Sequence, residues 1–126
     1  MTQVESSTRN VRLTVPAKPE YIVLTRLALS AVCRLTSLEP EDVADLKLAV
    51  TEAATAFVGE DSNDQLRCDF ELEDERLVLD IGGPHNSTVS DEEQELGQAI
   101  IRATVDECEF RNTGVRLVKY LREAEQ

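Results

Sequence analysis

The sequence predicts an α+β fold, a two-layer sandwich in which a mixed, mostly antiparallel sheet carries three helices on one face. Strands with alternating apolar residues occur mainly as adjacent pairs, and the segments with helical periodicity are too few to cover both faces of a sheet. A chain of 126 residues is also close to the commonest length of one domain. We therefore expect a single domain over residues 1–126, with elements in the order β-α-α-β-β-α-β-β.

The first half of the chain predicts one strand and two helices. Residues 11–15 alternate between apolar and polar as in a half-buried strand, and Pro16 ends the alternation. Pro19 opens a helix, and Pro40, within an acidic first turn, opens a second helix that runs to about Val58. The apolar residues of the first helix follow helical spacing and are Ile22, Val23, Leu27, Val32 and Leu35.

The second half of the chain changes to strict alternation. Residues 66–72 and 77–81 form a predicted β-hairpin, which the residues GGP end. The acidic, polar stretch from His85 to Glu95 is typical of a loop. The remaining elements are a helix from about Leu96 to Val105, a short strand with Cys108 and Phe110, a turn at RNTG and a last strand, VRLVKYL.

Composition narrows the class of partner and the compartment. The net charge of −12 argues against direct binding of nucleic acid or of an anionic membrane, because both rely on clustered Lys and Arg. Cys33, Cys68 and Cys108 are far apart and odd in number, so we expect buried, reduced thiols and neither disulfides nor a zinc site. The chain shows no signal peptide and no membrane span, which predicts a cytoplasmic protein.

Glu52, in the stretch TEAATAFV, is an isolated carboxylate on the second predicted helix. At 100° per residue the sheet-facing side of this helix holds Val43, Leu46, Val50, Ala53 and Phe57. Glu52 points roughly opposite, where a lone glutamate is ordinarily a solvated charge. Its neighbours on that stripe, however, are small or apolar: Leu48, Ala49, Thr55 and Ala56. Two interpretations remain, a solvated charge and a carboxylate that lines a cleft.

The segment DLKLAVTEAAT, Asp45 to Thr55, resembles the first conserved box of the anti-sigma factor serine-protein kinases, the RsbW and SpoIIAB group within the GHKL ATPases. The similarity continues in matching order through VPAKPEY, ELGQAIIRATVDECEF and GVRLVKYL. It implies the same two-layer sandwich, with ATP held between the helices and a lid. It also implies that Glu52 matches the general base that activates a serine or threonine hydroxyl on an anti-anti-sigma protein.

The metal position of this resemblance is altered. In the family an asparagine one helical turn after the glutamate binds Mg²⁺, whereas this chain has Ala56, which offers no oxygen ligand. Thr55, one position away, and Asn63, in the following loop, are the alternative oxygen donors nearby. We interpret the metal site as lost, so that no residue is assigned as a metal ligand and Glu52 is a vestigial base.

The nucleotide-binding boxes also depart from the family. Its Asp-x-Gly pattern, whose aspartate recognises adenine, has two placements here: an ungapped alignment puts Gly83 at the aspartate position, and a shortened strand lets Asp80 and Gly82 supply the pattern. We favour the first, because Asp80 occupies an outward position of an alternating strand. The glycine-rich lid is reduced to Gly97, which follows the acidic run DEEQE. ATP and Mg²⁺ are thus the cofactors that the resemblance implies, at a degenerate site formed by Glu52, Asp80, Gly82 and Gly97.

Three functions follow from the resemblance. The preferred one is an anti-sigma factor that sequesters an alternative RNA polymerase sigma factor and is regulated by partner switching with a STAS-domain anti-anti-sigma protein, with kinase activity lost or impaired. The second is an active ATP-dependent serine/threonine kinase, and the third is a switch protein that activates a phosphatase. A homodimer through the N-terminal strand and first helix is also implied.

Overall fold

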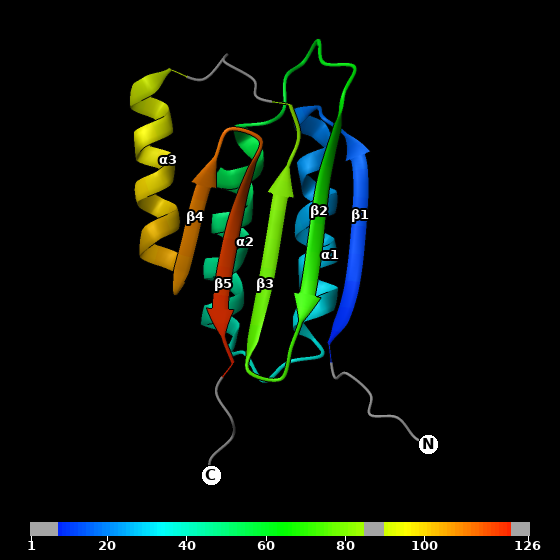
Figure 1. Ribbon diagram of the computed structural model, residues 1–126, viewed down its shortest axis with the longest axis vertical. Coiled ribbons are helices and arrows are strands. Elements are labelled where there is room, and N and C mark those ends of the chain that lie inside the picture. Colours follow the sequence, from blue (N-terminus) through cyan, green and yellow to red (C-terminus); the bar gives the residue numbers. More distant parts are fainter. Residues whose placement is uncertain (1–7, 85–89, 122–126) are drawn as a thin grey trace.

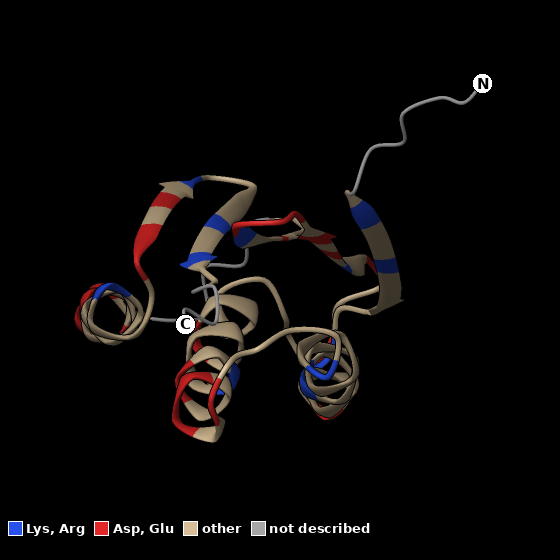
Figure 2. Cartoon of the chain, turned by 90° about the horizontal axis from the view of Figure 1, so that it is seen from below, with Lys and Arg blue, Asp and Glu red and all other residues tan. Residues whose placement is uncertain are grey.

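The computed structural model describes residues 8–84 and 90–121, which form one five-stranded sheet covered by helices on a single face (Figure 1). The strands are β1 (Arg9–Pro16), β2 (Gln65–Leu72), β3 (Arg76–Gly82), β4 (Glu107–Arg111) and β5 (Gly114–Tyr120). The helices are α1 (Ile22–Cys33), α2 (Pro40–Thr55) and α3 (Asp91–Thr104), with a 3₁₀ turn at Pro19–Tyr21 before α1. Figure 2 shows the two layers from below, and the predicted α+β sandwich and order of elements are confirmed.

The sheet has the strand order β1-β2-β3-β5-β4, and each of its pairs is antiparallel. The predicted mixed sheet is therefore antiparallel throughout the described residues. After β3 the chain passes through α3, enters the sheet at its edge as β4, and turns back as β5 to pair with β3. This path brings α3 beside α2 and alongside β4, at the left of Figure 1.

The core lies between the sheet and the helices. The alternating residues predicted for the β2–β3 hairpin are all buried: Leu66, Cys68, Phe70, Leu72, Leu77, Leu79 and Ile81. On α2, Leu46, Val50 and Ala53 are buried against them in the same cluster, as the helical spacing predicts. α3 packs beside α2, and the flank of α2 that carries Glu52 and Ala56 is directed toward α3.

The buried face of α1 differs from the one that apolar spacing alone suggests. Val23 and Leu27 are exposed, by 43% and 60%, and so is Leu35 after the helix. The buried positions are Ile22 and Val32, which the apolar spacing includes, together with Thr25, Leu29 and Cys33. Thr25 can be buried because its hydroxyl donates a hydrogen bond of 2.6 Å to the carbonyl oxygen of Ile22. An apolar strip consequently remains on the outer side of α1.

The predicted loop from His85 to Glu95 is wrong for its second part, because α3 begins at Asp91 rather than at about Leu96. Ser90 Oγ accepts a 3.1 Å hydrogen bond from the Glu93 amide, and the Glu93 carboxylate accepts one of 3.4 Å from the Ser90 amide. This capping box starts the helix. The acidic residues in its first turn stabilise it further, because their negative charges lie at the positive end of the helix dipole. Residues 85–89 lie outside the described residues.

The end of α2 was also placed too late, since the helix stops at Thr55 and not at about Val58. Phe57, in the turn that follows, and Val58, directly after it, are nevertheless buried. Within residues 8–84 and 90–121, none of the helices combines the length and the apolar character needed to cross a membrane.

Candidate functional site

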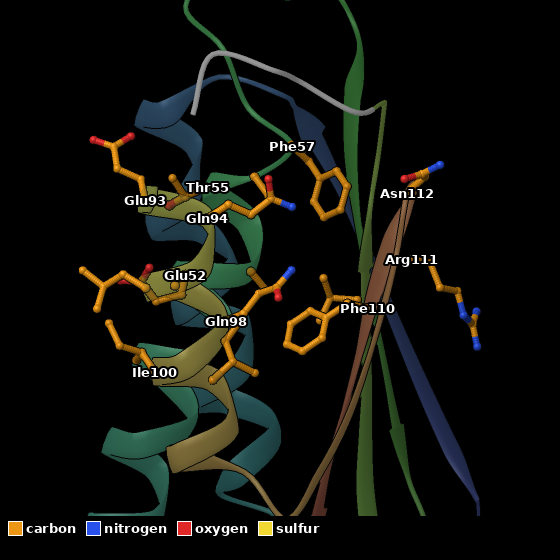
Figure 3. A pocket seen from close by; sticks show the side chains of 16 residues that line it. Glu52, Thr55, Phe57, Glu93, Gln94, Gln98, Ile100, Phe110, Arg111 and Asn112 are labelled. Carbon is orange, nitrogen blue, oxygen red and sulfur yellow. The ribbon is translucent and has the colours of Figure 1, made fainter. Parts of the chain in front are cut away.

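A cavity of about 370 Å³ lies between α2, α3 and the turn that joins β4 to β5. The interior shown in Figure 3 combines the amide side chains of Gln94 and Gln98, from α3, with the rings of Phe57 and Phe110. Glu52 contributes from α2, on the side that faces α3. The site is thus a mixed amide and aromatic hollow with one half-buried carboxylate on its wall.

Glu52 and Gly97, which sequence analysis placed in one site, are brought together here. A Cβ atom at position 97 would lie 3.1 Å from Oε1 of Glu52, so glycine allows α3 to approach the carboxylate closely. Glu52 receives no hydrogen bond or ion pair from any other described residue. Of the two interpretations of Glu52, the structure supports the one in which it lines a cleft.

The position expected to hold a metal ligand is Ala56, which lines the cavity one helical turn beyond Glu52. Thr55 also lines the cavity, but its hydroxyl donates a 2.7 Å hydrogen bond to the carbonyl oxygen of Thr51. Asn63 lines a separate hollow, just before the start of β2. Of the two alternative oxygen donors, Thr55 therefore lies on the cavity wall, one position from the expected asparagine, and Asn63 does not.

Asp80 and Gly82 do not line this cavity. They lie on the face of the sheet opposite to the helices, in register with Arg116 and Gly114 of β5. Asp80 accepts two hydrogen bonds from the Arg116 guanidinium, of 2.9 and 3.0 Å, and this contact raises the pKa of Arg116. The structure thus separates these two residues from Glu52 and Gly97 by the thickness of the sheet.

The amides of Gln94 and Gln98 are site residues that sequence analysis missed. They are one helical turn apart and face the same side of α3, but the first of them was assigned to the loop. The sequence signal that finds them is the capping motif from Ser90 to Glu93, because it extends the helix back through Gln94.

The charges around the cavity do not fit a magnesium-bound triphosphate. Arg111 lines the rim, but its side chain points away from the cavity (Figure 3) and donates hydrogen bonds of 2.9 and 3.1 Å to Glu109. Within the described residues, no other Lys or Arg lines the cavity. Transfer of a phosphoryl group requires metal ligands and positive groups around the phosphates, whereas this wall presents the carboxylate of Glu52 and the methyl group of Ala56.

Comparison with known proteins identifies the family. The family model described as "Histidine kinase-like ATPase domain" matches residues 15–119. The chain is 32% identical over 120 residues to the serine-protein kinase RsbW of Bacillus pumilus (strain SAFR-032), across 88% of this chain and 73% of that protein. It is 32% identical over 116 residues to the RsbW of Bacillus subtilis (strain 168), across 88% and 72% of the two chains.

A third relative, the serine-protein kinase RsbW of Listeria monocytogenes serotype 4b (strain F2365), is 31% identical over 119 residues. That alignment covers 88% of this chain and 74% of the relative. The family match extends from the last residues of β1 to the end of β5 and so includes every wall of the cavity. On this evidence the chain belongs to the histidine kinase-like ATPase domain family and is similar to RsbW serine-protein kinases.

Proposed function

We propose that this protein is an anti-sigma factor, a cytoplasmic binding module that sequesters an alternative RNA polymerase sigma factor. It releases the sigma factor when a STAS-domain anti-anti-sigma protein competes for it, and its ATP-dependent kinase activity is lost or impaired. The similarity to RsbW serine-protein kinases supports a role within this partner-switching class. The single observation that carries the loss of activity is Ala56, which stands beside Glu52 on the cavity wall without an oxygen ligand.

The electrostatic surroundings support the same proposal. A nucleotide bound beside α2 and α3 would meet the Glu52 carboxylate, and the acidic first turn of α3 lies close by. These carboxylates repel the negative charge of a polyphosphate. Within the described residues, no Lys or Arg side chain points into the cavity to offset this repulsion. We expect the loss of nucleotide binding to leave the fold intact, because the core is formed by apolar residues of the sheet and the helices.

We further propose a homodimer that forms through β1 and α1. The apolar strip on the outer side of α1, formed by Val23, Leu24 and Leu27, supports this surface, because all three side chains are more than a third exposed. Burial of these residues against a second copy removes apolar area from water, which is the main driving force of such association.

A calorimetric titration with Mg-ATP tests the loss of nucleotide binding. We expect no submillimolar binding, and no transfer of radiolabelled phosphate to a purified STAS-domain partner. Affinity purification from the native cytoplasm, followed by mass spectrometry, then tests the partner: we expect a sigma factor among the retained proteins. Recovery of a phosphatase without a sigma factor would instead support the phosphatase-activating switch.

An active kinase is the second candidate, favoured by one observation. Glu52 is retained, half-buried and free of hydrogen bonds from the described residues, so that its carboxylate is available to accept a proton. Under this alternative, Glu52→Gln abolishes phosphorylation of the partner protein that the unmutated chain carries out. Phosphate that appears on the STAS-domain partner with the unmutated protein and disappears with Glu52→Gln would overturn the preferred proposal.

A further inference from the structure

The outer face of the sheet, opposite to the helices, carries two rows of residues that run across all five strands. The strand register places Thr14, Arg67, Gly82, Gly114 and Arg111 in one row, here called the glycine row. The adjacent row, here called the charged row, contains Arg12, Asp69, Asp80, Arg116 and Glu109. The two rows therefore place four arginines and no lysine around a pair of glycines, in a protein whose net charge is −12.

The glycine pair forms the floor of a hollow of about 270 Å³. A Cβ on Gly82 would lie 2.5 Å from the carbonyl oxygen of Thr113, and one on Gly114 would lie 3.3 Å from that of Ile81. The contact at Gly82 restricts that position to glycine, and the contact at Gly114 leaves little room for a side chain. The sheet therefore has no side chains at these two adjacent positions. Arg67, Arg111 and Arg116 stand around this floor.

The charges of the hollow leave one guanidinium unpaired. Arg116 is bonded to Asp80, and Arg111 is bonded to Glu109. Asp69, which also lines the hollow, forms an ion pair of 2.8 Å with Arg12. Arg67 is exposed and forms no ion pair with any residue that the structure describes. Three arginines and two aspartates line the hollow, so that its lining carries a net charge of about +1.

We propose that this hollow binds the carboxylate of an acidic side chain, presented by an extended segment of a partner protein. Arg67 supplies a planar pair of N–H donors that matches a carboxylate, and the bare backbone of Gly82 and Gly114 lets the ligand approach the sheet. A single carboxylate balances the lining charge, whereas a phosphate would bring a second negative charge close to Asp69 and Asp80.

A neighbouring hollow indicates a polypeptide rather than a free small anion. It measures about 550 Å³. Arg67 and Thr113 line both hollows, so the two hollows adjoin near the first residues of β2. Its remaining walls are formed by the uncharged residues Gln65, Asn63, Gly83 and Pro84 and by one carboxylate, that of Asp64. Together the two hollows provide room for several residues of an extended chain, with the acidic residue at the glycine row and neutral residues beyond it. The site is on the opposite face of the sheet from Glu52, so this proposal does not depend on the chemistry there.

Nuclear magnetic resonance with the whole ¹⁵N-labelled chain tests the proposal. The probe is a blocked peptide of alternating Gly and Ser with one central Glu, and its matched control has Gln at the same position. With the Glu peptide we expect saturable shifts of the Gly82 and Gly114 amides and of Arg67 Nε, and an affinity about tenfold above that of the Gln peptide. Arg67→Gln should lower the affinity for the Glu peptide by a similar factor, because this substitution removes the unpaired guanidinium.

Arg34→Gln is the control variant, since it removes the same charge from an exposed position at the end of α1. It should leave the affinity for the Glu peptide unchanged. Absence of shifts at the two glycines, equal affinities for the Glu and Gln peptides, or an unchanged affinity in Arg67→Gln would each overturn the proposal. Inorganic phosphate is the second probe. Tighter binding of phosphate than of the Glu peptide at the same signals would overturn it too, because the hollow would then be a site for small anions.

Discussion

Gly97 of α3 lies against the carboxylate of Glu52 on α2, close enough that a methyl group on Gly97 would stand 3.1 Å from Oε1. The two helices therefore meet where one has no side chain and the other has a charged one. This contact determines how closely α3 can approach α2 beside the cavity.

Gly97→Ala should stabilise the protein by about 0.5–1 kcal/mol, because alanine is the better helix former at an interior position of α3. The new methyl group requires only that the end of the Glu52 side chain move by a few tenths of an ångström, which the absence of hydrogen bonds to that carboxylate permits. Urea denaturation measures the change in the free energy of unfolding. In a Glu52→Ala background, Gly97→Ala should raise the free energy of unfolding slightly more. A net loss of stability in either background would show that α3 cannot accommodate the methyl group.

Ala56→Asn should leave the protein without kinase activity even though it restores the family's metal ligand. Magnesium binding is only one missing element, since none of the described Lys and Arg side chains points into the cavity and Asp80 lies on the other face of the sheet. Without contacts to the phosphates and adenine, the nucleotide is not positioned for in-line transfer. Transfer of radiolabelled phosphate to a STAS-domain partner measures the result, and activity in Ala56→Asn alone would contradict it.

Leu27→Asp should convert the proposed dimer to a monomer without unfolding it. Leu27 is 60% exposed on the outer side of α1, so a carboxylate there is solvated in the monomer but buried at a dimer interface. Light scattering at micromolar concentration measures the mass, and circular dichroism confirms the fold. Leu48→Asp, at an exposed apolar position of α2, is the matched control and should remain dimeric. A monomeric mass for the unmutated chain would refute the proposed assembly.

Ser90→Ala should cost about 1 kcal/mol, because it removes the side-chain acceptor of the capping box. The loss should appear first as faster amide hydrogen exchange in α3, since Ile101 is the one fully buried residue among those that the structure describes in this helix. Exchange in β2 and β3 should change much less. A Ser90→Asp variant keeps an acceptor at the same place and should exchange at nearly the original rate.

Cys33 and Cys68 should resist alkylation at about pH 8, because the thiolate is the reactive form. Burial raises the pKa of Cys68 to about 12 and that of Cys33 to about 11, so both remain protonated until the pH is strongly alkaline. Cys108, which is only half-buried, should react first. Mass spectrometry after timed exposure to iodoacetamide gives the three reaction rates. In the denatured protein, the three cysteines should react at similar rates.

Sequence patterns succeed here where one periodicity determines the outcome. Strict alternation gives the buried face of β2 and β3, and the same alternation places Asp80 outward, where it is found beside Arg116. The pattern fails on α1, because Thr25 is polar by type yet buried with its hydroxyl bonded to the backbone. The cavity could not be predicted, since Gln98 and Phe110 approach each other only through the path of the chain from α3 into an edge strand.

The pairing of β1 with β2 has a consequence for how the chain folds. Arg9 lies opposite Leu72 and Pro16 opposite Gln65, so α1 and α2 are both contained in the connection between these strands. The β2–β3 and β4–β5 hairpins close over short turns, whereas β1 can join only after a long loop has been closed. We expect the two hairpins and the helices to form early and β1 to dock last, which makes the first strand the slowest part of the sheet to assemble and the easiest to displace.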